Sequence, residues 1–166
     1  MTLLDEFFAM PATATDQEVL EKLFSAALES KGYPHPEAAT EKFLAASDAG
    51  VRASLSECAR KTLTVNIQTN VALALADTMQ REVDSRFSNE ALAKLDPQTI
   101  KDLQFVMEEC YKDLHAAKEQ AAKITSARTR GMQTACNVIH ILYTAHLAGH
   151  ARVSEAEAEA EATTDE

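Results

Sequence analysis

Apolar residues recur at helical spacing along most of this chain, and one segment is especially regular. Eight apolar positions are separated alternately by three and four residues: Ile100, Leu103, Met107, Cys110, Leu114, Ala117, Ala121 and Ile124. This alternation is the a/d seam of a heptad repeat, sustained over more than three heptads. It predicts a long amphipathic helix over 97–130 whose seam is the candidate interaction stripe. The seam either packs within the chain or pairs with another copy, and we favour packing within the chain.

A second long helix is predicted over about 51–86. Its apolar positions recur every four residues: Leu55, Ala59, Leu63, Ile67, Val71, Leu75, Met79, Val83 and Phe87. At 3.6 residues per turn such a row drifts around the helix, so we expect the buried face to wrap. Within 62–71 the alternation of Leu63, Val65 and Ile67 with polar residues also fits a half-buried strand. No partner strand is evident elsewhere, so helix is the preferred interpretation of 62–71.

Several local signals indicate where helices begin. Thr15 followed by Glu18 forms a capping box, in which each side chain accepts a hydrogen bond from the other residue's backbone amide. Asp96 before Pro97 places an N-cap acceptor ahead of a proline suited to the first helical position. Shorter helices are expected over 3–10, 37–46 and 88–94.

Glycines indicate where helices end, because a left-handed residue commonly closes a helix. Gly32 stands at such a position after the helix that starts at Thr15. Gly131 is expected to end the seam helix at about Arg130, and Gly149 to end a last helix over 132–148. With short connections between them, these helices predict antiparallel neighbours in a bundle.

The predicted fold class is therefore all-α: a helical bundle with a long helix hairpin, formed by about 51–86 and 97–130. We expect three segments. Short N-terminal helices occupy 1–50, the bundle core occupies 51–150, and an acidic tail occupies 151–166. The end of the tail, VSEAEAEAEATTDE, alternates Glu and Ala without an apolar face, so we expect it to be disordered.

Composition agrees with a helical chain that carries an uneven charge. There are four Gly, four Pro and no Trp in 166 residues, and the net charge is −10. Residues 1–50 carry −6, 51–152 carry +2 and 153–166 carry −6. An acidic total disfavours nonspecific binding to nucleic acid or anionic membrane. Three cysteines without a CxxC pair predict no disulfide framework, and no segment resembles a signal peptide or a membrane span, so we expect a cytoplasmic protein.

The run ACNVIHILYTAHLAGH, from Ala135 to His150, concentrates the candidate metal-binding residues: Cys136, His140, His146 and His150. The two i,i+4 pairs point in different directions on one helix, roughly 240° apart, so they do not converge without further ligands. Histidines near a helix C-terminus also have a structural explanation, since they interact favourably with its exposed carbonyls. We therefore predict a packed helix, with no metal and no cofactor, although a metal- or ligand-binding bundle stays a second alternative.

A basic stretch near the end of the seam helix is the remaining candidate site. Lys118, Lys123, Arg128 and Arg130 are candidates for contact with phosphate or with an acidic partner. Basic residues are also favoured in the last turns of a helix for electrostatic reasons, and interleaved aromatics are missing. Adjacent carboxylates such as Glu108 and Glu109 point about 100° apart, so no catalytic pair is predicted.

These patterns favour a non-enzymatic, all-helical protein that acts through a protein partner or as a homo-oligomer, an interaction or assembly subunit. The alternative is a nucleic-acid-associated assembly or regulatory protein that uses the basic end of the seam helix. No membrane partner is expected.

Overall fold

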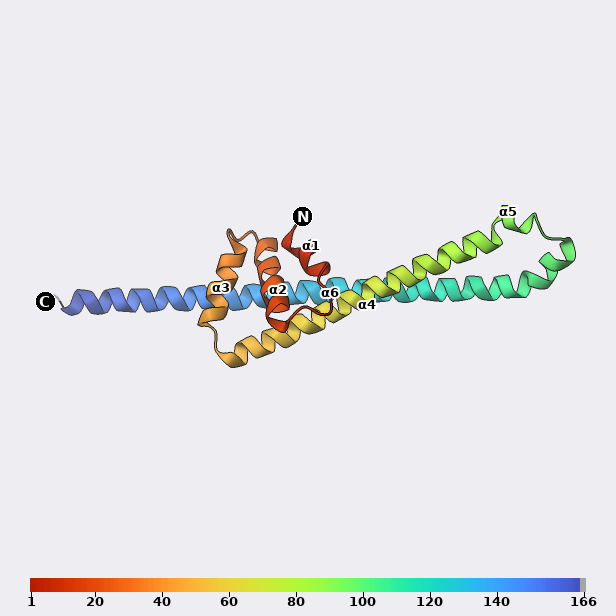
Figure 1. Cartoon of the computed structure of the whole chain (residues 1–166). Helices are drawn as coiled ribbons and strands as arrows, with labels where there is room; N and C mark the ends of the chain where they lie inside the picture. The colour runs from red at the N-terminus through yellow and green to blue at the C-terminus, as the bar shows by residue number, and fades with distance from the viewer. Residues whose placement is uncertain (165–166) are drawn as a thin grey trace. The chain divides into compact units, whose positions relative to one another are not determined.

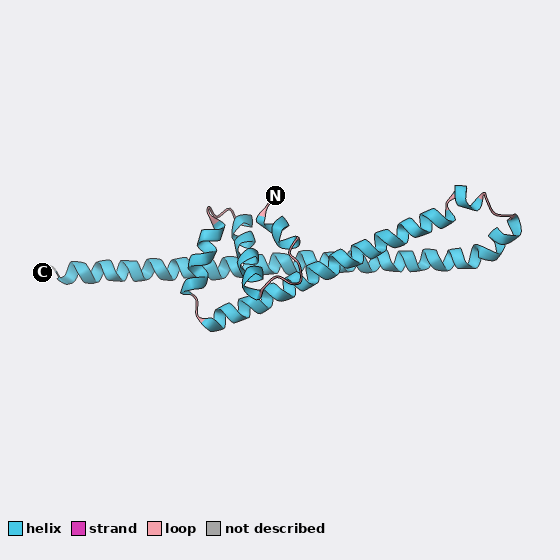
Figure 2. Cartoon of the chain, viewed as in Figure 1, coloured by secondary structure: helices cyan, strands magenta, loops and turns pink. Residues whose placement is uncertain are grey.

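The computed structural model describes the backbone of residues 1–164, with side chains described for 1–149 and 156–162. Six helices account for it: α1 (Leu3–Phe8), α2 (Asp16–Ser30), α3 (Pro36–Ala46), α4 (Ala49–Phe87), α5 (Asn89–Leu92) and α6 (Pro97–Thr164). Figures 1 and 2 show these helices and their connecting loops, and no strand occurs among the described residues. The all-α class is confirmed, and 62–71 is helical within α4.

The chain forms two compact units, and each long helix contributes to both. The first unit, which we call the N-terminal unit, contains Met1–Leu63 together with Gly131–Glu166, and the second, the hairpin unit, contains Thr64–Arg130. These limits differ from the segment boundaries expected at residues 50 and 150, because Met1–Leu63 and Gly131–Glu166 belong to one unit although they are distant in the sequence.

Local sequence signals place most helix ends as predicted. At α2, the backbone amide of Glu18 donates to Thr15 Oγ1 at 3.2 Å, and the amide of Thr15 donates to Glu18 Oε2 at 2.8 Å. Gly32 follows α2 with a φ of 82°, the left-handed conformation that glycine adopts without strain. At α6, the amide of Thr99 donates to Asp96 Oδ1 at 3.0 Å.

The predicted helix breaks at Gly131 and Gly149 are wrong, because α6 continues through both as one helix to Thr164. A glycine inside a helix costs about 1 kcal/mol relative to alanine, which a long helix tolerates. At Gly32 the chain meets Pro34 and Pro36 soon afterwards, and these residues prevent a helix from continuing. Pro97 is the last proline in the sequence, so nothing comparable blocks α6.

The acidic tail continues the backbone of α6 as far as Thr164. Its described side chains, at 156–162, are all exposed, which agrees with a segment that has no apolar face to bury. The last two residues, 165–166, lie outside the described residues.

The core of the N-terminal unit is aromatic and aliphatic, and α2 supplies more of it than any other helix. Val19, Leu23 and Phe24 are fully or almost fully buried. The ring of Phe24 stacks on Phe43 of α3 with 4.7 Å between centroids. Tyr143 of α6 approaches both rings edge-on, at 6.4 Å from each. This cluster attaches the run that begins at Ala135 to α2 and α3.

The hairpin unit pairs the later part of α4 with the earlier part of α6 in antiparallel orientation. Near the end of α4, the ring centroid of Phe87 lies 6.4 Å from that of Tyr111 on α6. Earlier on α4, Asn66 accepts a hydrogen bond from Arg128, further along α6, at 3.4 Å. The predicted long hairpin is thereby confirmed. Among the described residues, no helix combines the length and the hydropathy that crossing a bilayer requires.

Candidate functional site

The eight seam residues face the interior of the hairpin unit. Leu114 and Ala121 are buried, and the other six are half-buried. Phe105 and Val106, which flank the seam, are exposed instead. Since α4 pairs with α6 in this unit, little of the seam is open to a partner. The exposed apolar surface of these helices lies on their other faces.

On α4 the four-residue apolar row leaves the interior in its middle part. Val71 and Leu75 are 53 % and 59 % exposed, while Val83 further along is buried. A row with a period of four advances about 40° per step relative to the helix, so it cannot face one partner throughout its length. The wrapping expected from the sequence therefore leaves apolar side chains on the outer surface of the hairpin.

Polar residues take the interior positions that this row vacates. Asn66 is 1 % exposed and Thr69 is fully buried, and the Thr69 hydroxyl donates to the backbone carbonyl of Val65 at 2.8 Å. The guanidinium of Arg128 donates to Asn66 Oδ1 at 3.4 Å and to Asn70 Oδ1 at 3.5 Å. Buried polar positions of this kind set the register of paired helices at some cost in stability. The sequence does not reveal them, because its apolar row is continuous through this part of α4.

The basic stretch is divided between two environments. Lys118 donates to Gln80, and Arg128 makes the contacts described above, so both are directed toward α4. Lys118, Lys123 and Arg130 are all exposed, and Arg128 is half-buried. Contact of these four cations with phosphate or with an acidic partner stays a prediction.

The cysteine and histidines of the metal hypothesis are placed by packing. Tyr33 Oη and His140 Nε2 are 3.1 Å apart, and the ring of His146 lies edge-on to Phe43 at 5.2 Å. Burial raises the pKa of the Cys136 thiol, against the opposing effects of a Ser30 hydrogen bond and the Lys31 charge. The side chain of His150 lies outside the described residues. Among the side chains that are described, no three His, Cys, Asp or Glu residues converge as metal ligands would.

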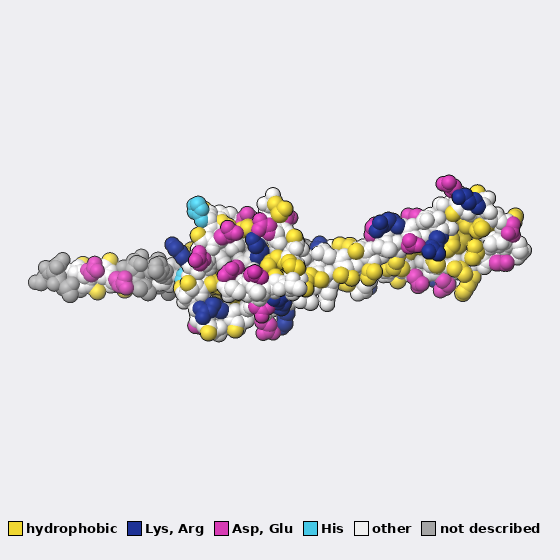
Figure 3. Space-filling view, in the orientation of Figure 1, with side chains coloured by type: hydrophobic (Ala, Val, Ile, Leu, Met, Phe, Trp, Pro, Cys, Tyr) yellow, Lys and Arg dark blue, Asp and Glu magenta, His cyan; other side chains and the backbone are white. Residues whose placement is uncertain are grey.

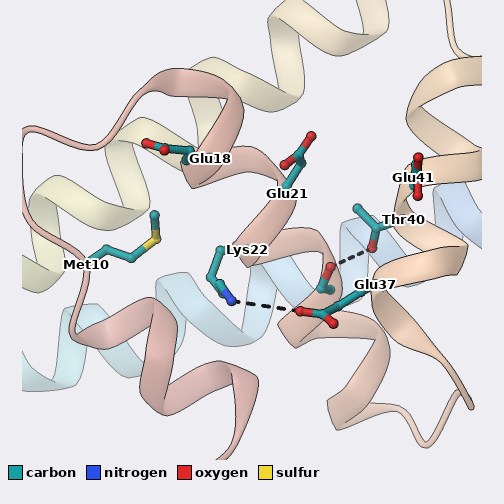
Figure 4. A pocket seen from close by; sticks show the side chains of 8 residues that line it. Met10, Glu18, Glu21, Lys22, Glu37, Thr40 and Glu41 are labelled. Atoms are coloured by element: carbon teal, nitrogen blue, oxygen red, sulfur yellow. Dashed lines mark hydrogen bonds and ion pairs between the residues drawn. The ribbon is translucent and has the colours of Figure 1, made fainter.

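An acidic pocket in the N-terminal unit was not foreseen from the sequence. It has a volume of about 600 Å³ and is lined by Met10, Glu18, Glu21, Lys22, Ser25, Glu37, Thr40 and Glu41 (Figure 4). Lys22 pairs with Glu6 at 2.5 Å and lies 4.0 Å from Glu37. The Ser25 hydroxyl donates to Thr40 Oγ1 at 2.9 Å.

Three of the four acids of this pocket, Glu18, Glu21 and Glu37, make contacts with other side chains or with the backbone. Hydrogen bonds from the backbone and side chain of Thr15 lower the pKa of Glu18, which keeps that carboxyl ionised as a helix cap. Glu21 accepts a hydrogen bond from Gln17 at 2.5 Å. A proton-donating carboxylic acid would need a raised pKa, so Glu18 does not resemble a general acid.

An exposed apolar surface lies on α6, within the run that begins at Ala135. Met132, Ala135 and Ile139 are buried, and they form the packed face of this part of the helix. Val138 and Ile141 are exposed, Ile141 by 65 %. Residues 131–151 contain no Asp, Glu, Lys or Arg, which is the longest such interval in the chain. This uncharged interval was visible in the sequence, but the sequence alone did not indicate which side of the helix would be covered.

A shorter interval without charges occupies residues 62–76 of α4, around Val71 and Leu75. Figure 3 shows the corresponding change in surface character. Hydrophobic and uncharged atoms cover this part of α4, whereas Lys, Arg, Asp and Glu side chains gather on the hairpin nearer α5. We name the two surfaces the α6 outer face (Thr134–Ala148) and the α4 outer face (Ile67–Thr78).

The chain was compared with protein families, curated proteins and solved structures. None of the three comparisons found a significant match.

Proposed function

We propose that this chain is a non-enzymatic helical subunit that acts by binding protein, as an interaction or assembly component. The observation that carries the proposal is the exposure of Val138 and Ile141 on a helix interval without charged residues. Scattered exposed apolar residues are ordinary, but apolar surface that continues along a helix marks interaction sites.

The chemistry of the described side chains supports binding over catalysis. Among the pocket acids, Glu18 caps a helix and Glu37 lies near Lys22, and on α6 His140 and His146 contact aromatic rings. For the nucleic-acid alternative, Lys118 and Arg128 form side-chain hydrogen bonds with α4, and the exposed cations of that stretch are Lys118, Lys123 and Arg130. Three exposed cations on a chain of net charge −10 supply little counterion release, so the protein partner is the better-supported proposal.

Site-specific photo-crosslinking in cells of the source organism tests this function. A photoreactive amino acid at Ile141 or at Val71 samples the two outer faces, and one at Glu21, exposed on α2, is the matched control. We expect a covalent adduct with a protein from at least one outer face and none from position 21. Absence of an adduct from both outer faces contradicts the proposed function.

A further inference from the structure

The two helices of the hairpin unit bury little apolar surface between them. The buried apolar residues of this unit are Ala76, Val83, Leu114 and Ala121, and two of these four are alanines. Six of the eight seam residues are only half-buried. The core of a helical bundle is normally closed by facing helices on more than one side. The hairpin unit therefore keeps apolar side chains available to further helices.

One side of the hairpin is closed by a contact between its own helices, where Lys118 Nζ donates to Gln80 Oε1. Gln80 lies about 40° around α4 from the buried Ala76, and Lys118 lies about 40° around α6 from the buried Leu114, in the same rotational sense. Rotation in the same sense thus leads to the same side of this antiparallel pair, and the hydrogen bond marks that side.

The opposite side of the hairpin is open and apolar. Rotation in the other sense, by between about 40° and 100° from Ala76 and Leu114, leads to a set of six apolar residues. Leu75 is 59 % exposed and Val106 is 46 % exposed, and the other four are half-buried. We name this set the open side of the hairpin: Ala72, Leu75, Met79, Val106, Ala117 and Ile124.

The open side is large enough for a stable interface, because two helices contribute to it. Residues 64–87 of α4 make roughly 36 Å of helix, and two adjacent helices are about 20 Å wide. Their product is a footprint of roughly 700 Å². A stable interface buries about 800 Å² on each partner, so a partner that covers this whole side meets that requirement.

The hairpin unit is close to neutral, but its charge changes along its length. The end away from α5, residues 64–76 and 120–130, carries three bases and no acid. The remainder, residues 77–119, carries six bases and ten acids. Two hairpins whose α5 ends point in opposite directions set the positive end of each beside the negative part of the other. Hairpins that point in the same direction set positive beside positive, which opposes association.

We propose that the open side of the hairpin binds the open side of a second copy of this chain, with the two α5 ends pointing in opposite directions. This inference rests on the proposed function, because it names the protein partner. An identical hairpin brings an apolar side of matching size and the opposite charge at each end. A two-fold axis relates the copies, and the product is a four-helix bundle.

Native mass measured by light scattering tests the open side. The full chain should have the mass of two copies, whereas Leu75→Asp and Val106→Asp should each have the mass of one. Both residues are exposed, so both variants should fold, which far-ultraviolet circular dichroism checks. Leu73→Asp is the matched control, because Leu73 is 43 % exposed and lies about 60° from Ala76 toward the closed side. This control should remain dimeric.

Three outcomes of that measurement contradict the inference. A wild-type chain that stays monomeric up to its solubility limit overturns self-pairing. Dimers that persist in both Leu75→Asp and Val106→Asp overturn the role of the open side. A dimer that Leu73→Asp abolishes as completely as Leu75→Asp also overturns the assignment to this side.

Fluorescence energy transfer between copies tests the orientation. Lys94, just after α5, and Lys123, toward the other end of the hairpin, are both exposed, and noncanonical amino acids there can carry a donor or an acceptor. In mixed dimers, transfer from position 94 of one copy to position 123 of the other should exceed transfer between the two positions 94. The reverse ranking overturns the opposed orientation of the hairpins.

Failure of self-pairing and failure of the proposed function are distinguishable. Native mass tests self-pairing without the crosslinking that tests the proposed function. An adduct of position 71 with a second copy of the chain supports both proposals. An adduct only with a different protein, from a chain that is monomeric alone, overturns self-pairing and leaves the proposed function standing.

Discussion

Tyr33 Oη lies 3.1 Å from His140 Nε2, and this contact joins the turn after α2 to α6, 107 residues later in the chain. It is accompanied by an edge-on contact between Tyr33 and Tyr143, at 5.0 Å between ring centroids. His140, a candidate metal ligand in the sequence, is thus positioned by a hydrogen bond with the Tyr33 hydroxyl within the N-terminal unit.

Replacing Tyr33 with Phe removes this hydrogen bond and keeps the ring contacts. We expect the free energy of unfolding to fall by about 1 kcal/mol, the usual net contribution of a hydrogen bond. Urea denaturation followed by circular dichroism measures it. Tyr111→Phe, at an exposed tyrosine, is the control and should stay within about 0.5 kcal/mol of wild type. Equal effects of the two substitutions would contradict a stabilising role for the Tyr33–His140 contact.

Arg128 should matter for the stability of the hairpin, and Arg130 should not. Arg128→Ala removes one hydrogen-bond partner of the buried Asn66 side chain, so we expect a loss of roughly 1–2 kcal/mol in the free energy of unfolding. Arg130→Ala removes an exposed cation and should change it by less than about 0.5 kcal/mol. Thermal unfolding of both variants at one salt concentration makes the comparison. A larger effect of Arg130→Ala than of Arg128→Ala would contradict a stabilising role for the Arg128–Asn66 contact.

Gly131→Ala should stabilise α6. A Cβ added at Gly131 meets no atom within 4 Å, and the residue is helical with an ordinary φ. Alanine restricts the unfolded chain more than glycine does, so we expect a gain of about 0.5–1 kcal/mol. Gly32→Ala provides the opposite case, because Gly32 has a φ of 82° and alanine there is strained. Chemical denaturation of the two variants should shift the midpoint in opposite directions.

The capping box of α2 should make stability depend on pH through Glu18. Its folded-state pKa is lowered by hydrogen bonds from Thr15, so its contribution is present above the unfolded-state pKa and is lost as pH falls through the folded-state value. The stability difference between wild type and Glu18→Ala should therefore be constant near neutral pH. It should shrink once pH drops below roughly 4.3, the ordinary glutamate pKa. A difference that persists unchanged down to pH 2 would exclude an ionised cap.

The local features of this fold were predictable from the sequence because they depend on residues a few positions apart. Thr15 with Glu18, Gly32 before Pro34, and Asp96 before Pro97 each satisfy or block backbone hydrogen bonds within one turn. The heptad seam of α6 was visible for a similar reason, since its spacing follows from helical geometry alone.

Helix continuity through Gly131 could not be inferred from glycine by itself. A glycine has the same local preferences at residue 131 as at residue 32, and the difference comes from the residues after it. Proline shortly after Gly32 excludes further helix, whereas no proline occurs beyond Pro97. Packing of Met132, Ala135 and Ile139 in the N-terminal unit then offsets the modest cost of a glycine inside the helix.

By itself the sequence determined that the chain is helical, where most helices start, and which residues form apolar stripes. Only the tertiary structure decided which stripe is covered. Asn66 and Thr69 lie inside the hairpin while Val71 and Leu75 lie outside, and Ile139 is packed while Ile141 is open. The reason is that a stripe specifies a side of a helix, but burial depends on where the partner helix passes, and that depends on contacts between residues far apart in the chain.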